Sequence, residues 1–558
     1  MTSPCQKLLV YLFVSFLLIG SASGQNSFFK FKITKEGIYK ISASQAQKLG
    51  ANSLSEIAVY GYPGMLPQLL VSENLDLQEI PALEKDGNLY FYLSSPNSYH
   101  YTENAIEYHP NQFSDSISFL IGTSENAKRI STISAHSGPS IPAVLYQWNW
   151  LKEDVNNMLN SGRAWYSRAV APGVTRGYPL PLSTESTDKW KVSAKLMGAS
   201  SSESKINLAV DDMTISESLI GGIPTSTYGI KGQEIRVSEE FSPLGNKVER
   251  LRISFQASDP NASGYFEYIG IGVPQSSKSL HEGIFSMDQK SSISIALLAG
   301  LSAWEISDFY QPQALDFSKG SNVTGKKFIV FDEAKTPEIA EIEKANLSLR
   351  TQSPWPALLI ITPRLLSNSS EKLALHKIGM GIYSEVAYLD EIYDAFGYGN
   401  SDLNAIRNFL AWHYHQGGKL KNVLILGKGT FDYKGILGGR PNLVPIYTSR
   451  NSLNPLTTFS SDDYFSLLKF GQGEWEESRE GDELNQIGVG RLPVINPQEA
   501  KIVVDKIINY ESNPKAGDWK QTVTFLADDG DNNIHLRDSE THAKFLSDNH
   551  KEFKQEKL

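Results

Sequence analysis

Cysteine is nearly absent from this 558-residue chain, whose only example is Cys5. Residues 25–558 therefore form no disulfides, and their stability has to come from ordinary hydrophobic cores. The same absence leaves that part of the chain without a thiol nucleophile, so no cysteine-based catalysis is assigned to it. Because Cys5 precedes the first apolar run instead of ending it, it does not fit a lipoprotein anchor.

An apolar run of membrane-spanning length is also missing. The run 8–20 is too short, since a spanning helix takes roughly 20 residues. Lys7 provides a positive start, and Ala22 and Gly24 are small residues at the spacing of a signal-peptidase site. We predict a signal peptide over residues 1–24, with an N-terminal anchor helix as the alternative. The mature chain is then exported, and is either soluble or held at the surface by a partner.

Positive charge is not in excess either. The formal net charge is −10, and the sequence contains no basic stripe that could follow a phosphate backbone. The composition therefore argues against a nucleic-acid partner.

Period-two alternation of apolar and polar residues predicts short strands over 25–135 and again from residue 186, whereas 136–185 shows only weak periodicity. A short helix is expected over 42–49, capped by Ser42. The predicted fold class is multidomain, with β-rich N-terminal domains of β-sandwich or jelly-roll type. The expected parts are an N-terminal β-rich domain over 25–135, a connecting region over 136–185, and a β-sandwich over 186–320.

Near residue 325 the pattern changes to continuous apolar strands that alternate with helices. Segments 327–331, 358–361 and 422–426 are such strands, and helices are expected over 337–349 and 402–415. This alternation is typical of a parallel sheet covered on both faces. We predict an α/β domain over 325–558. Because the rhythm would place another strand next, we expect the sequence to be an N-terminal fragment with an incomplete last sheet.

Several segments of the predicted α/β domain carry a family resemblance. They are 388–397, 402–410, 423–433, 460–465, 487–494 and 526–531. In order and spacing they resemble the first half of the gingipain-type cysteine peptidase domain, family C25. Weaker cues at 35–39, 76–81 and 109–115 favour a sortase of the type IX secretion system over a secreted gingipain.

The resemblance implies a caspase-like fold in two subdomains and a histidine–cysteine dyad in the second. Both catalytic residues fall after residue 558, so none is assigned, and this chain alone is expected to be inactive. The implied function is a cysteine-type endopeptidase that removes C-terminal sorting signals from secreted cargo at the outer-membrane surface. Its implied partners are that cargo and type IX secretion components, and no cofactor is required. The alternative is a non-enzymatic surface-binding protein with a degenerate peptidase-like domain.

Three acidic residues are candidates for substrate binding. Asp528, Asp529 and Asp531 follow a predicted strand, and parallel sheets bind ligands at the carboxyl ends of their strands. In arginine-specific gingipains an acidic residue of this loop contacts the basic side chain of the substrate. The loop here does not align residue for residue, so that specificity is not carried over. A turn with a helix N-cap remains the alternative.

A second acidic pair is a candidate for metal binding. Asp462 and Asp463 match acidic positions near a calcium site of the gingipains, and carboxylates suit calcium. One departure is Lys428, which replaces an acidic residue of the family, so that Asp432 would have to compensate. A calcium ion is thus possible here, and a turn or N-cap pair is the alternative.

Overall fold

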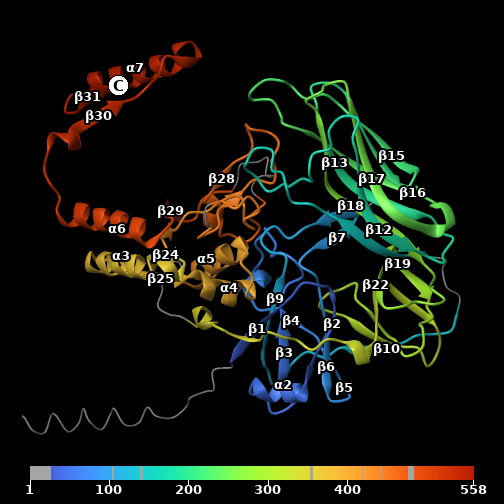
Figure 1. Cartoon of the computed structure of the whole chain (residues 1–558). Helices are drawn as coiled ribbons and strands as arrows, with labels where there is room; N and C mark the ends of the chain where they lie inside the picture. The colour runs from blue at the N-terminus through green and yellow to red at the C-terminus, as the bar shows by residue number, and fades with distance from the viewer. Residues whose placement is uncertain are drawn as a thin grey trace, which may run out of the picture.

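The computed structural model describes residues 27–102, 106–138, 143–351, 356–417, 419–439, 442–474 and 483–558. A large β-rich half packs beside an α/β domain, and a small final unit lies apart from both (Figure 1). The predicted signal peptide falls outside the described residues. Within them, no helix combines the length and the apolar character needed to cross a membrane.

The N-terminal β-rich domain consists of a five-stranded sheet, in the order β23-β1-β9-β3-β4, and a three-stranded sheet, β2-β6-β5. Phe31, Ile41, Phe91 and Phe119 belong to one buried cluster between them. Helix α2 (Ala43–Lys48) begins with the predicted cap, because Ser42 forms a capping box with Gln45. The strands are β1 (Phe28–Ile33), β2 (Gly37–Ser42), β3 (Ile57–Tyr60), β4 (Glu79–Ile80), β5 (Leu83–Lys85), β6 (Asn88–Leu93), β9 (Ile117–Thr123) and β23 (Glu343–Ala345), with a separate hairpin of β7 (Ser98–Tyr101) and β8 (Ile106–His109).

The second β-rich unit is a sandwich of a nine-stranded sheet, β10-β21-β20-β22-β19-β11-β18-β13-β16, and a four-stranded sheet, β12-β17-β14-β15. Trp190, Leu208, Phe255 and Ile269 come from both sheets and share one core. The strands are β10 (Ser131–Ser134), β11 (Leu145–Leu151), β12 (Thr175–Ser183), β13 (Trp190–Ala199), β14 (Ser204–Val210), β15 (Met213–Ile220), β16 (Gln233–Phe241), β17 (Lys247–Ala257), β18 (Ser263–Gln275), β19 (Gly283–Ser294), β20 (Ser302–Glu305), β21 (Gln313–Asp316) and β22 (Asn322–Phe331).

These sheets extend across the expected domain boundaries. The connecting region 136–185 supplies β11 to one sheet of the sandwich and β12 to the other. The strand expected at 327–331, which we expected to open the α/β domain, is the end of β22 and pairs with β19 and β20. Periodicity shows that these segments are strands, but it does not show which sheet each one joins.

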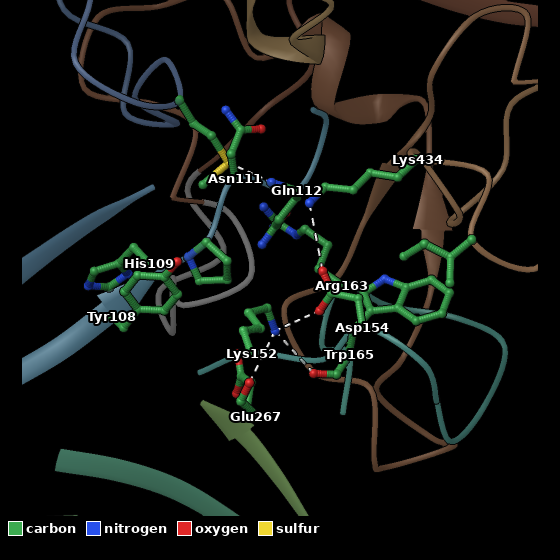
Figure 2. Close-up of a pocket in the computed structure, with 13 residues that line it drawn as sticks. Tyr108, His109, Asn111, Gln112, Lys152, Asp154, Arg163, Trp165, Glu267 and Lys434 are labelled. Carbon is green, nitrogen blue, oxygen red and sulfur yellow. Dashed lines mark hydrogen bonds and ion pairs between the residues drawn. The ribbon is translucent and has the colours of Figure 1, made fainter. Parts of the chain in front are cut away.

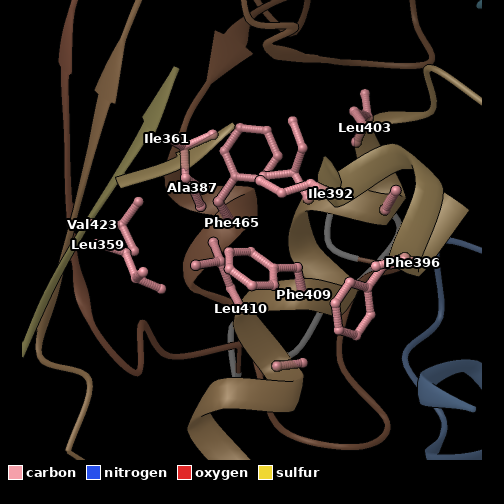
Figure 3. Packing of buried hydrophobic residues seen from close by; sticks show 14 of the residues in the cluster. Leu359, Ile361, Ala387, Ile392, Phe396, Leu403, Phe409, Leu410, Val423 and Phe465 are labelled. Carbon is pink, nitrogen blue, oxygen red and sulfur yellow. The ribbon is translucent and has the colours of Figure 1, made fainter. Parts of the chain in front are cut away.

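The α/β domain contains a four-stranded parallel sheet in the order β25-β24-β26-β29. Successive residues of β24 point to opposite faces: Leu359 and Ile361 pack against α4 and α5 (Figure 3), and Ile360 packs in the cluster of α3 and α6. Burial on both faces explains the continuous apolar strands. The elements are β24 (Leu358–Thr362), α3 (Ser367–Gly379), β25 (Ser384–Tyr388), α4 (Leu389–Gly397), α5 (Leu403–Gly417), β26 (Asn422–Leu426), β27 (Tyr447–Thr448), β28 (Ser460–Ser461), β29 (Gly488–Leu492) and α6 (Pro497–Ser512).

The helix expected over 337–349 is wrong. Ile339 and Pro337 exchange backbone hydrogen bonds with Lys40 of β2, and β23 pairs with β1 in the N-terminal domain. Pairing with distant strands therefore overrides the helical propensity of this segment. Short 3-10 turns are found at η2 (Leu54–Glu56), η3 (Ser72–Leu75), η4 (Leu244–Asn246), η5 (Glu333–Lys335), η6 (Ser348–Arg350), η7 (Arg364–Leu366), η8 (Asp463–Ser466) and η10 (Asp518–Gln521).

The last unit is β30 (Thr522–Phe525), α7 (Gly530–Asn549) and β31 (Lys554–Lys557), in which the two strands are parallel. It leaves large apolar side chains in solvent; Leu526 is 80% exposed. The multidomain prediction, β-rich domains followed by an α/β domain with a parallel sheet, is confirmed.

Candidate functional site

The carboxyl edge of the parallel sheet is the place where an α/β fold of this kind binds ligands. Strands β24, β26 and β29 end there at Thr362, Leu426 and Leu492. After β26 the chain leaves the sheet in a long excursion that includes β27 and β28 and runs toward the β-rich half (Figure 1). This excursion and the strand ends form the candidate site.

Arg491 holds this edge together. Its Nε and Nη2 each donate to one carboxylate oxygen of Asp462, both at 2.7 Å. Its Nη1 donates to the carbonyls of Gly427 (2.7 Å) and Val444 (2.8 Å), and Nη2 reaches that of Pro445 (3.1 Å). The Arg491 side chain is only 9% exposed. A bidentate ion pair of this kind fixes the excursion to the end of the sheet.

The acidic residues near Arg491 do not fit a calcium site. Arg491 occupies both carboxylate oxygens of Asp462, and Asp463 lies exposed at the start of η8. Asp432, expected to compensate for Lys428, accepts hydrogen bonds from the backbone amides of two residues in the following turn. No group of three or more metal-ligating side chains exists among the described residues. Asp462 therefore has a structural partner where the resemblance implied a metal.

Tyr433 also holds this excursion in place. Its hydroxyl donates to the carbonyl of Ile446 at 2.6 Å, and its ring packs against Phe113 of the N-terminal domain. Burial raises the pKa of the Tyr433 phenol to about 12, so the group stays a neutral donor at physiological pH.

A family model connects this architecture to a known group of proteins. Residues 351–558, which contain the parallel sheet and the final unit, match the model of peptidase family C25. Through these residues, the chain contains a gingipain-like C25 domain. The "C25 domain" below means residues 351–558.

One solved structure extends the comparison beyond the C25 domain. Dimeric latent PorU from Porphyromonas gingivalis matches with a TM-score of 0.74 and 19% identity, over 89% of this chain and 50% of that chain. The complex of RgpB pro- and mature domains from the same organism matches with a TM-score of 0.26 and 18% identity, over 36% and 41% of the two chains. This chain thus spans about half the length of the PorU chain. No curated protein matches it in sequence.

The structure does not bring the two predicted acidic groups together. Asp528, Asp529 and Asp531 lie at the carboxyl end of β30, in the final unit, away from the Arg491 clamp (Figure 1). All three are exposed, and Asp531 is 3.4 Å from His535. Their position after a strand is the predicted one, and their role in substrate binding stays a prediction.

A polar cavity of about 120 Å³ is lined by residues of the C25 domain and of both β-rich domains (Figure 2). Lys434, from the excursion after β26, forms an ion pair with Asp115 of the N-terminal domain at 2.6 Å. Asp154, after β11, lies 3.7 Å from Lys434 and 2.7 Å from Lys152. This charge network spans three parts of the chain, and it connects the candidate site to the β-rich half.

Sequence reasoning missed the residues that build this edge. Arg491 lies in the segment 487–494 that resembles the family, but the sequence alone assigns no role to it, to Lys434 or to Asp154. A signal existed only for Arg491, because a lone arginine inside an otherwise apolar strand predicts a buried charge that needs a partner. A single charged residue in a loop, such as Lys434, carries no comparable signal.

The described residues include no cysteine, so the geometry offers no thiol nucleophile. They do form an ordered carboxyl edge, in which Arg491 holds the excursion after β26 against the strand ends. The charge network around Lys434 connects this edge to the β-rich domains.

Proposed function

We propose that this protein acts as a cysteine-type endopeptidase and sortase of a type IX secretion system. It removes C-terminal sorting signals from secreted cargo at the outer-membrane surface, where it meets other components of that system. The observation that carries the proposal is the shared fold with PorU over 89% of the chain, because that likeness includes the β-rich domains as well as the C25 domain.

The proposed chemistry needs a thiolate that attacks the cargo carbonyl and a histidine that moves the protons. In a sortase, the acyl-enzyme then passes to an amine instead of water. Since Cys5 is the sole cysteine of the sequence and lies ahead of the proposed cleavage site, residues 25–558 alone are inactive in this proposal. Asp528, Asp529 and Asp531 are the proposed substrate contacts, through their place at the carboxyl end of β30.

The test is deletion of the gene in the bacterium that carries it, followed by mass spectrometry of the C-termini of secreted cargo. We expect cargo to accumulate with its sorting signal intact, and the complete gene to restore trimming. Codons 1–558 alone should not restore it. Cargo that is trimmed normally after deletion would overturn the proposal in favour of a non-enzymatic surface-binding protein. Restoration by codons 1–558 would overturn the claim that this part is inactive.

A further inference from the structure

An arm of the N-terminal domain is buried in the C25 domain. The docking arm, residues 61–78, leaves the N-terminal domain after β3 and returns to it at β4. Its three buried leucines belong to the core that contains Phe409 and Phe465 of the C25 domain, not to the core of their own domain. Those leucines are Leu66, Leu70 and Leu75.

Side chains at the start of α5 hold the backbone of the arm. The amide of Leu66 donates to Oδ2 of Asp402 at 2.8 Å, and Nδ2 of Asn404 donates to the carbonyl of Leu66 at the same distance. Both backbone groups of Leu66 are thus satisfied by the C25 domain. Arg407 continues the pattern one turn later by donating to the carbonyl of Gln68.

The loop before the final strand of the sheet holds the other end of the arm. The amide of Leu70 donates to the carbonyl of Gln472, and the amide of Gly471 donates to the carbonyl of Leu70, both at 2.8 Å. The side chain of Gln68 donates to the carbonyl of Gly473 at 2.7 Å. Most of these hydrogen bonds are made by the backbone of the arm, and a small number of polar groups of the C25 domain supply the partners.

Asp402 is the titratable member of this set. It is 3% exposed, and its carboxylate also accepts the amide of Asn404 at 2.8 Å. Burial raises the pKa of Asp402 to about 6, against the lowering effects of its two amide donors and of Arg407 and Arg163. The other ionisable groups that face it are phenols whose pKa is raised by burial, and which therefore stay neutral. These are Tyr62, Tyr393, Tyr433 and Tyr464.

We propose that Asp402 makes the docking arm a pH-sensitive latch, which mild acid tightens and neutral or alkaline pH loosens. This inference concerns the hold of the C25 domain on the N-terminal domain, and it does not rest on the proposed peptidase function. Its physical basis is that docking removes the carboxylate from water, while release returns the carboxylate to solvent.

The direction in which pH shifts the docking of the arm follows from proton linkage. A carboxyl group with a pKa of about 6 when docked and 3.8 when solvated takes up a proton on docking between pH 4 and 6. Acid in this window therefore favours the docked state, and the gain is lost as the pH rises through 6. From these two values, the fraction of arm that is open should be about tenfold higher at pH 8 than at pH 5.

Hydrogen exchange of the full chain tests the latch at the amides of Leu66 and Leu70. After correction for the intrinsic pH dependence of exchange, protection should be about tenfold higher at pH 5 than at pH 8. In Asp402→Asn, which mimics the neutral carboxyl, protection should be equally high at both pH values. The matched control is Asp394→Asn, since Asp394 is another buried carboxylate between the domains, paired with Lys30 at 2.7 Å. This control should keep the pH dependence.

Equal protection of the wild-type arm at pH 5 and pH 8, or higher protection at pH 8, would overturn the proposal. So would a pH dependence that persists in Asp402→Asn. The wild-type series decides the matter even where a variant fails to fold.

Discussion

Arg491 and Asp462 form a two-point ion pair, with Nε and Nη2 each 2.7 Å from a carboxylate oxygen. Arg491 lies on β29 and Asp462 directly follows β28, so the pair joins the last strand of the sheet to the excursion after β26. The guanidinium also donates hydrogen bonds to the carbonyls of Gly427 and Val444. The Arg491 side chain thereby holds the end of β29 and the excursion together at the carboxyl edge of the sheet, where the candidate site lies.

Replacing Arg491 should destabilise the C25 domain strongly. Arg491→Met leaves the carboxylate of Asp462 and several carbonyls without their donor, and breaking a largely buried pair in this way costs about 3 kcal/mol. The control is Arg364→Met, because Arg364 pairs with Asp390 and Glu391 but is 54% exposed. That change should cost less than about 1 kcal/mol. Urea denaturation measures both, and equal costs would contradict the central role of Arg491.

Calcium should not stabilise the protein through Asp462. Because both carboxylate oxygens are occupied by Arg491, a calcium ion would first have to displace a bidentate guanidinium. We expect the melting temperature of the chain to be the same in millimolar calcium chloride and in EDTA. A calcium-dependent rise that disappears in Asp462→Asn would show that the resemblance to the calcium site of the gingipains holds after all.

The sequence predicted the α/β elements well where burial alone determines them. Leu359, Ile360 and Ile361 are buried on both faces, so their continuous apolar run identifies β24 without further information. The strand expected at 422–426 is β26, and the helix expected at 402–415 is α5 with its ends shifted by a residue or two. These elements follow from local pattern.

What the sequence could not predict depends on distant partners. Leu66 and Leu70 look like leucines of the N-terminal domain, yet they pack in the core of the C25 domain. The segment 337–349 has helical composition, but its backbone pairs with β1 and β2. Asp462 is a metal candidate through the family resemblance alone, and the guanidinium that pairs with it is 29 positions away in the sequence. The local periodicity of the sequence contains no information about contacts between such distant residues.

Asn408 provides a stability test inside α5. Its side chain is fully buried, and neither amide atom has a hydrogen-bond partner among the described residues. Since an unpaired buried amide costs about 1–3 kcal/mol, Asn408→Leu should stabilise the protein by about 1 kcal/mol. Asn404→Leu, one turn earlier, is the control: that amide bonds Leu66 and Tyr464, so its loss should destabilise. Thermal unfolding should move in opposite directions for the two variants, and loss of stability in both would contradict the assignment.

Export is testable at the N-terminus. The positive Lys7, the short apolar run and the small residues Ala22 and Gly24 predict cleavage after Gly24. Edman sequencing of the protein recovered from the cell surface should therefore begin at Gln25 or within a few residues of it. Gly24→Leu, which places a bulky residue at the cleavage position, should slow the processing. A mature protein that still begins at Met1 would refute the signal peptide.

Substitutions at two glycines beside the docking arm can distinguish the effect of backbone strain from that of close packing. Gly471 and Gly473 both have positive φ, at +90° and +117°, so a Cβ atom strains the backbone at either position. A Cβ on Gly471 would meet nothing within 4 Å, whereas one on Gly473 would lie 2.0 Å from the carbonyl oxygen of Gln68 and 2.1 Å from Nη1 of Arg407. The arm passes over Gly473 with no room for a methyl group.

Gly471→Ala should therefore cost only the strain of a left-handed alanine, about 1 kcal/mol. Gly473→Ala should cost more than that, because the added methyl group pushes Gln68 away from Arg407 and opens the arm. Limited proteolysis can separate the two effects, since an open arm is cut within 61–78 before the domains unfold. Early cutting there should appear in Gly473→Ala and not in Gly471→Ala. If both variants are cut alike, backbone strain alone explains the effect, and the close approach of Gln68 to Gly473 does not hold the arm in place.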